Sequence, residues 1–386
     1  METLRVLWLN WRDITSPWAG GAELYTHQVA MRLARKGHEV TLFTSRYPGS
    51  LKREQRDGVD IVRRGNASTV YLHAPKFVLA ATKSGAGYDV IVDAINTVPF
   101  FSPLYSGNAP VVALVYQLTG EIFLREFARP VGHLLYSMEK KTYVPWYLSH
   151  ADHLVVLSES NKAELSQASF DMDAERISVI PPGVDHDRFG PGPKFNEPTI
   201  LFMNRLVRYK QPEHIIMAMK KVCARVAESR LIMVGTPVNR RYLTYLRRAV
   251  DTTGLESRIT FLLPRPFSSS KISLLQGAWV HVLPSIKEGF GLSILEAGAC
   301  GTPTVGYDVP GLRDAVIQGR TGLLVRPGDT SALAMCLIDL LDDQTRLARL
   351  CDGARRWASC FQWERTAERF AATMRVVSRT NRSRSG

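Results

Sequence analysis

The chain has 386 residues, of which 45% are hydrophobic and 22% are charged, and its formal net charge at pH 7 is +13. These proportions are those of a globular protein and exclude a disordered or collagen-like chain, and the length allows two domains with separate cores. The charge is uneven, because residues 1–190 hold 20 Lys and Arg against 20 Asp and Glu, whereas residues 191–386 hold the remaining 29 against 16. We therefore expect the second half to bind anions.

The ends and the cysteines indicate a cytoplasmic protein. Glu2 and Arg5 interrupt the first apolar run, so no signal peptide is expected, and no later run is long enough to cross a bilayer. The five cysteines form no Cys-x-x-Cys pair and leave an odd one over, which is typical of reduced thiols. No helix-turn-helix, zinc-finger or ribonucleoprotein pattern accompanies the basic charge, which argues against a nucleic-acid partner.

The first half alternates strand-like and helix-like segments. A strand over residues 4–9 leads through a loop to Gly20-Gly21, and then to a helix that ends near Gly37. The glycine pair is open to two interpretations, a tight turn or a place where the backbone approaches a ligand, and its position after the first strand favours the second. Further strands are expected over residues 40–43, 59–62, 90–92, 111–115, 154–157 and 177–180.

Proline and glycine clusters at 181–183 and 190–193 interrupt this alternation and mark a linker. We expect an N-terminal domain over residues 1–188, a C-terminal domain over 189–360, and a helix over 361–386 that returns to the N-terminal domain and ends in a basic, frayed tail. In the second half, strands are expected over residues 200–203, 231–234, 259–263 and 280–283. The predicted fold class is α/β, with two tandem Rossmann-like, doubly wound domains facing an interdomain cleft.

The run from Lys287 to Glu296 is the strongest candidate for a binding site. It consists of a glycine turn between an apolar strand and a helix, and such a turn directs backbone N–H groups and the positive end of a helix dipole toward an anion. Glu288 and Glu296 are about 12 Å apart along a helix with a rise of about 1.5 Å per residue. That separation is too long for an acid and base acting on one bond and fits the two ends of an elongated ligand.

Four motifs in order resemble a known family. They are Gly20-Gly21-Ala22-Glu23, Arg205 with Lys210, Gly289-Phe290-Gly291-Leu292, and Glu288-x7-Glu296. Together they are similar to the retaining family-4 glycosyltransferases of the GT-B fold, and the resemblance spans nearly the whole chain.

The resemblance implies a UDP or GDP sugar as donor and a hydroxyl group of a glycan, lipid-linked or secondary-metabolite acceptor, with no metal ion or other cofactor. It implies that Arg205 and Lys210 bind the diphosphate and that Glu288 binds a hydroxyl of the transferred sugar, and these three form the catalytic group. Glu296 would bind the ribose. The remaining donor contacts would come from Gly20, Gly21, Tyr116, Phe290, Gly291 and Leu292. Fixed cations near a departing diphosphate stabilise the transition state more than the ground state.

Two positions depart from the family pattern. Tyr116 stands where a histidine is common, and Gln211 stands where a glycine commonly follows the lysine. A phenol can donate a hydrogen bond to a sugar but does not titrate near neutral pH. The departure at Tyr116 leaves open a non-catalytic sugar-nucleotide or glycan-binding paralogue, and a sugar-nucleotide epimerase is a third hypothesis.

Some relatives dock on membranes through basic amphipathic surfaces of the N-terminal domain. In this chain that domain is neutral overall and carries only local basic clusters, such as Lys52 with Arg53 and Arg63 with Arg64. We expect a cytoplasmic protein and leave open its peripheral association with the inner face of the membrane. The sequence does not indicate an oligomeric state.

Overall fold

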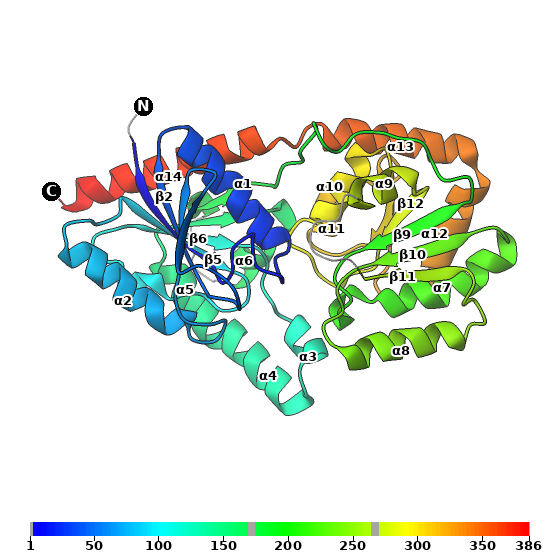
Figure 1. Cartoon of the computed structure of the whole chain (residues 1–386), viewed down its shortest axis with the longest axis horizontal. Coiled ribbons are helices and arrows are strands. Elements are labelled where there is room, and N and C mark those ends of the chain that lie inside the picture. The colour runs from blue at the N-terminus through cyan, green and yellow to red at the C-terminus, as the bar shows by residue number, and fades with distance from the viewer. Residues whose placement is uncertain (1–2, 169–173, 264–269, 386) are drawn as a thin grey trace. The chain divides into compact units, whose positions relative to one another are not determined.

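The structure is a computed structural model that describes residues 3–168, 174–263 and 270–385 (Figure 1). The chain divides into two compact units: unit 1 comprises Met1–Phe123, Arg129–Pro182 and Trp363–Gly386, and unit 2 comprises Leu124–Ala128 and Gly183–Gln362. The chain passes between the units at 123/124, 128/129, 182/183 and 362/363, whereas the expected boundaries were 188/189 and 360/361. The difference arises because the backbone of Val184 bonds to Phe361, which places the end of the linker in unit 2.

Unit 1 contains an eight-stranded sheet in the order β3-β4-β2-β1-β5-β6-β7-β8. All neighbouring strands pair in parallel except β3, which pairs antiparallel with β4. The strands are β1 (Arg5–Leu9), β2 (Glu39–Thr44), β3 (Arg53–Arg56), β4 (Val59–Arg63), β5 (Val90–Ile95), β6 (Val111–Val115), β7 (His153–Val156) and β8 (Ile177–Val179). Their near-continuous apolar sequences are those of strands buried on both faces.

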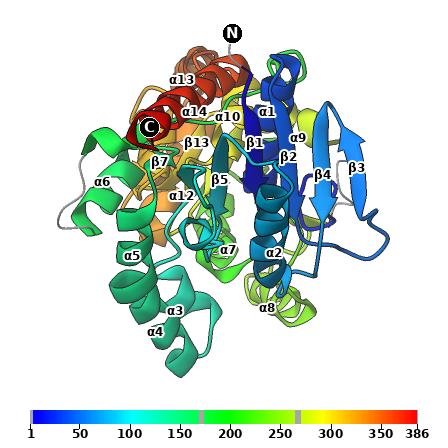
Figure 2. The ribbon, with the colours of Figure 1, turned by 90° about the vertical axis from the view of Figure 1, so that its left-hand side faces the viewer.

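Helices cover both faces of this sheet (Figure 2). The helices of unit 1 are α1 (Gly21–Arg35), α2 (Val70–Lys83), α4 (Arg129–Met138), α5 (Val144–His150), α6 (Glu159–Ala168) and α14 (Trp363–Ser385). Residues of α2 and α5 pack in one core with β1, β5 and β6. On the other face α14 packs beside α1, and Phe370 stacks on Trp8 with ring centroids 4.9 Å apart. The C-terminal helix therefore belongs to the core of unit 1.

Unit 2 contains a six-stranded parallel sheet in the order β11-β10-β9-β12-β13-β14. Its strands are β9 (Thr199–Met203), β10 (Arg230–Val234), β11 (Ile259–Leu262), β12 (Val280–Leu283), β13 (Thr304–Tyr307) and β14 (Gly322–Val325). Its helices are α7 (Pro212–Arg225), α8 (Arg240–Asp251), α9 (Ser270–Gly277), α10 (Leu292–Ala299), α11 (Leu312–Ala315), α12 (Thr330–Asp342) and α13 (Gln344–Ala358). Helix α7 packs beside α12, and α10 packs beside α13. Helix α3 (Ile122–Glu126) lies where the chain enters the short segment that joins unit 2.

The predicted fold class, two tandem Rossmann-like α/β domains, is confirmed. Strands β3, β13 and β14 were not predicted. Helix α14 continues to Ser385, into the basic segment that was expected to be a frayed tail. Burial of Phe370, Ala371 and Met374 in unit 1 holds that helix in place despite its basic end. Within the described residues, no helix has both the length and the apolar character needed to cross a bilayer.

Candidate functional site

A short loop after β9 carries the two predicted cations. Arg205 is exposed, and its guanidinium donates to the Tyr209 hydroxyl at 3.1 Å. A 3₁₀ turn, Arg208–Lys210, then leads into α7, whose first residue is Pro212, as suits a position that has no intrahelical N–H bond. Lys210 is buried, with a relative exposure of 4%. One cation is therefore exposed to solvent, and the other is buried inside the unit.

A glycine turn after β12 lies beside this loop, because the backbone N–H of Ile286 donates to the carbonyl of Tyr209 at 3.0 Å. The turn ends at Gly291, which has φ = 82° and precedes α10. The positive φ favours glycine at this position, and an added Cβ would lie 2.8 Å from the end of the Ile294 side chain, which would have to shift. The sequence prediction of strand, glycine turn and helix is confirmed here.

Lys210 and Glu288 form an ion pair between these two loops. The ammonium of Lys210 bonds to Oε1 of Glu288, and the Ser285 hydroxyl donates to the same oxygen at 2.8 Å. The side chains of Lys210 and Glu288 are only 5% and 10% exposed. Burying each charge would be costly alone, so each residue depends on the other. The structure thus brings together two of the three predicted catalytic residues.

Glu296 has a different partner. Its carboxylate accepts a hydrogen bond from the ammonium of Lys271 at 2.6 Å, and the two side chains are 5% and 39% exposed. Glu288 and Glu296 therefore do not form an acid–base pair with each other, as their spacing in the sequence predicted. The assignment of Glu296 to a ribose and Glu288 to a sugar stays a prediction.

The turn also presents backbone donors. In the part of the chain that the structure describes, the N–H groups of Phe290, Gly291 and Leu292 have no hydrogen-bond partner. Such groups at the start of a helix attract anions. The Phe290 ring is meanwhile packed edge-to-face on Phe361, with centroids 5.3 Å apart, which fixes the turn through its side chain.

The backbone conformation of Gln211 explains why a glycine is common at this position in the family. It adopts φ = 48° and ψ = 47°, a left-handed conformation that glycine takes more readily than other residues. Its side chain is buried at 5% exposure, and its Oε1 has no hydrogen-bond partner among the described residues. A backbone requirement thus accounts for a glycine at this position, and this chain meets it at the cost of strain.

Gly20 and Gly21 lie in unit 1, where α1 begins. The N–H of Gly20 donates to the carboxylate of Glu23 at 2.7 Å, which caps the helix start. Gly20 has φ = −139°, and an added Cβ would lie 3.6 Å from Glu23, an ordinary contact; at Gly21 it would meet no atom within 4 Å. Nothing in the described chain requires glycine at these positions, which supports the interpretation that a ligand approaches this backbone.

The loop that precedes these glycines is held by a buried ion pair. Arg63 donates two hydrogen bonds to Asp13, at 2.7 and 3.0 Å, and both side chains are inaccessible to solvent. Burial opposes ionisation of Asp13, but the hydrogen bonds from Arg63 and Thr15 outweigh it and lower the pKa of the carboxyl group. The charged pair therefore keeps the loop in one conformation.

Tyr116, at the end of β6, is almost fully buried. Its hydroxyl donates to the carbonyl of Ala22 at 2.9 Å and lies 2.5 Å from the Thr26 hydroxyl, so both of its partners are on α1. Burial raises the pKa of the phenol well above its ordinary value, so it stays neutral. The predicted sugar contact therefore competes with two contacts that the hydroxyl already makes.

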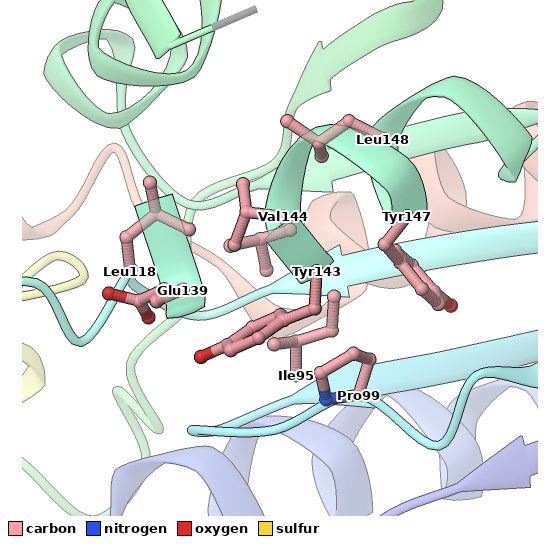
Figure 3. Close-up of a pocket in the computed structure, with 9 residues that line it drawn as sticks. Ile95, Pro99, Leu118, Glu139, Tyr143, Val144, Tyr147 and Leu148 are labelled. Carbon is pink, nitrogen blue, oxygen red and sulfur yellow. The ribbon is translucent and has the colours of Figure 1, made fainter. Parts of the chain in front are cut away.

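A small, largely apolar cavity lies below the loops that follow β5 and β6 (Figure 3). Leu118 and Glu139 are at one end of it and Tyr147 is at the other. Glu139 belongs to a π-helical turn, and its carboxylate accepts hydrogen bonds from the N–H groups of Thr119 and Gly120. The Glu139 carboxylate thus holds the loop after β6.

Four residues near the predicted site were not identified from the sequence: Glu126, Lys271, Ser285 and Gly311. Glu126 accepts a hydrogen bond from the N–H of Tyr209 at 3.0 Å, and Gly311 lies so close to the turn that an added Cβ would be 2.2 Å from the Glu288 carbonyl. Only Gly311 carries a signal in the sequence, a glycine after a proline, and this signal does not show what it contacts. Within residues 3–168, 174–263 and 270–385, no group of three or more His, Cys, Asp or Glu is arranged to hold a metal ion.

Comparison of the sequence with protein families gives two matches that divide the chain. The family "Glycosyltransferase Family 4" matches residues 19–188, and "Glycosyl transferases group 1" matches residues 184–357. A D-inositol 3-phosphate glycosyltransferase from Stackebrandtia nassauensis is 30% identical over 91% of this chain and 85% of its own length. One from Nocardia farcinica is 27% identical over 91% of this chain and 83% of its own length.

Solved structures show the same fold over the whole length. Sucrose-phosphate synthase from Thermosynechococcus elongatus has a TM-score of 0.81 at 24% identity, covering 97% of this chain and 99% of that one. Anabaena Alr3699/HepE, solved in complex with UDP and glucose, has a TM-score of 0.75 at 20% identity and covers 97% of this chain and all of its own.

Proposed function

This chain belongs to the glycosyltransferases of family 4 and group 1, and from that premise we propose that it transfers a sugar from a nucleoside diphosphate to a hydroxyl acceptor. The observation that carries the proposal is the buried Lys210–Glu288 pair, whose lysine lies on the loop that also carries exposed Arg205, together with N–H groups at the start of α10 that have no partner among the described residues. Cations and N–H donors suit a diphosphate, and a carboxylate suits a sugar hydroxyl. The UDP-glucose complex of Anabaena Alr3699/HepE supports a UDP sugar as the first donor to test.

We propose retention of the anomeric configuration and a reaction that needs no metal ion. Glu288 and Glu296 are each bound to a lysine ammonium, which makes both poor candidates for a nucleophile. The bond from the anomeric carbon to the diphosphate oxygen would break while the acceptor oxygen bonds to that carbon from the same face. The acceptor proton would pass to the departing phosphate oxygen. Arg205 and Lys210 would stabilise the charge that develops on the diphosphate.

The first experiment measures nucleotide release by the full chain from a panel of UDP and GDP sugars, with and without acceptor hydroxyls. D-inositol 3-phosphate is included because the relatives are named for it. We expect turnover of at least one donor and no loss of rate in EDTA. NMR should show that the product has the same anomeric configuration as the donor. Tight donor binding without release of nucleotide would instead identify a non-catalytic binder. Interconversion of donors without acceptor would identify an epimerase.

Helix α4 favours an acceptor at a membrane surface, a proposal that the charge of unit 1 alone did not support. Three of its apolar side chains, Val131, Leu134 and Met138, are 48%, 60% and 45% exposed. Their spacing of three and four residues places them on one stripe of the helix, and the exposed residues Lys140 and Lys141 follow directly. An exposed apolar stripe beside lysines suits the boundary of an anionic bilayer.

Vesicle co-sedimentation tests this surface. We expect the protein to bind vesicles of phosphatidylglycerol and phosphatidylethanolamine and to be only partly released by high salt, because the apolar contacts are insensitive to screening. Leu134→Glu should abolish binding. Leu72→Glu is the matched control, since Leu72 is 71% exposed on α2 in the same unit. Equal binding by the two variants, or no binding by the unmodified protein, would contradict the proposal.

A further inference from the structure

A chain of buried polar groups joins the ends of three strands to the start of α1. Asn96 follows β5, and its amide donates to the side-chain oxygen of Asn10, which follows β1, at 2.9 Å. The Asn10 amide donates to the Thr26 hydroxyl at 3.2 Å. Thr26 lies 2.5 Å from the hydroxyl of Tyr116, which follows β6. Asn10, Thr26 and Tyr116 are at most 6% exposed.

One assignment of the protons satisfies every hydrogen bond in this series. The Tyr116 hydroxyl has one proton, which it donates to the carbonyl of Ala22 at 2.9 Å. The Thr26 hydroxyl must therefore donate to Tyr116, and the acceptor position left on Thr26 is filled by the Asn10 amide. Each donor is used once along the series, and the loss of one member leaves its neighbour unpaired inside the protein.

This series of hydrogen bonds ends one residue from the glycine pair. Ala22 directly follows Gly21, and its carbonyl is the final acceptor. The carboxylate of Glu23 holds the N–H of Gly20 from the other side at 2.7 Å. The backbone of Gly20 and Gly21 is thereby fixed by two side chains, those of Tyr116 and Glu23, which bond to the backbone of Ala22 and Gly20.

We propose that Tyr116 is a positioning residue, which holds the Gly20–Gly21 backbone for the substrate through Ala22 and Thr26 and does not itself contact the sugar. The proposal rests on the proposed function in one respect, because it takes the glycine backbone to be a substrate contact. A hydroxyl committed to two partners on α1 acts by setting geometry, and a displacement of about 1 Å at a site of reaction can reduce the rate about 100-fold.

The test compares four variants of the full-length protein. Tyr116→Phe removes the phenol hydroxyl, and Thr26→Val removes the hydroxyl that bonds to Tyr116. Thr26→Ser keeps a hydroxyl at position 26. Tyr105→Phe is the control, because Tyr105 likewise donates from its phenol to a backbone carbonyl, that of Phe100 at 2.9 Å, outside the chain. Amide hydrogen exchange of residues 20–26 is measured without ligand, and kcat and KM are measured with the sugar nucleotide found active in the release assay.

We expect Tyr116→Phe and Thr26→Val each to raise the exchange rate at residues 20–26 and to lower kcat 10- to 100-fold, with KM for the donor changed less than threefold. Thr26→Ser should keep both properties of the unmodified protein. The double variant of Tyr116→Phe and Thr26→Val should be no more impaired than either single variant, since loss of one hydrogen bond already interrupts the series. A Tyr116→Phe variant with normal exchange, or a Thr26→Ser variant as impaired as Thr26→Val, would overturn the proposal. So would a large rise in KM, which indicates a direct sugar contact.

The exchange measurement separates this proposal from the proposed function. It needs no substrate, so the loss of protection in Tyr116→Phe and Thr26→Val supports the positioning role even if no donor is turned over. If exchange changes as expected while kcat stays normal, the chain holds α1 but the glycine backbone is not a substrate contact, and that outcome contradicts the proposal as stated.

Discussion

A Lys210→Met variant is expected to lose sugar transfer by about 100- to 1,000-fold, the usual effect of removing one group that stabilises a developing anion. It should also unfold more easily, by about 3–5 kcal/mol, because removal of one partner leaves the other as a buried charge without compensation. Glu288 is that partner, with a side chain 10% exposed, and its carboxylate also accepts a hydrogen bond from the Ser285 hydroxyl.

A second variant separates these two effects. In Lys210→Met with Glu288→Gln neither member of this buried pair carries a charge, so urea denaturation should show most of the lost stability restored, while activity stays low. Lys221→Met is the control, since Lys221 is an exposed lysine of unit 2 that bonds to Ser331. Recovery of transfer in the double variant would show that Lys210 serves only to pair with Glu288, and the proposed role at the diphosphate would be wrong.

A Gly21→Ala variant is expected to lower activity about 10- to 100-fold while leaving the fold as stable as before or up to about 1 kcal/mol more stable. Gly21 is the first residue of α1, and an alanine there lowers the entropy of the unfolded chain and favours the helix. A new Cβ would meet no atom of the protein within 4 Å. If activity falls, the methyl group must therefore obstruct something that is not part of the chain, since a misplacement of 1 Å near the reaction is enough to reduce the rate.

Gly87→Ala is the matched control for that experiment. Gly87 also has no atom within 4 Å of its added Cβ, and it precedes β5, at the end of the strand opposite to the predicted site. Thermal unfolding and initial rates are measured for both variants. Full activity in Gly21→Ala would show that no ligand approaches this backbone, and the interpretation of Gly20-Gly21 as a simple helix start would be correct.

Two of the strands missed from the sequence, β3 and β13, have separate physical reasons. Strand β3 (Arg53–Arg56) is polar because it is the exposed antiparallel edge of its sheet, so it lacks the apolar run of the other strands. Strand β13 contains Gly306, which resembles a turn signal in the sequence. An added Cβ there would lie 2.8 Å from the carbonyl of Leu283 on the neighbouring strand, so this glycine is needed for close pairing.

The candidate site residues could be proposed from the sequence because they belong to short local motifs. Arg205 and Lys210 follow one strand, and Glu288 and Glu296 follow another, so spacing and residue type were enough to select them. Their partners Ser285 and Lys271 could not be selected in this way, because serine and lysine are common at surfaces and their importance depends on one contact each.

The sequence by itself determined the two α/β domains, the glycine turn before α10 and the family, because apolar periodicity and short motifs are properties of neighbouring residues. Only the tertiary structure decided how charges and hydroxyls are paired. Lys210 meets Glu288, Lys271 meets Glu296, and Tyr116 reaches α1 instead of standing free for a sugar. The reason is that a buried polar group must find a partner wherever the fold supplies one, and the partner is set by the packing of strands and helices, which separation along the chain does not reveal.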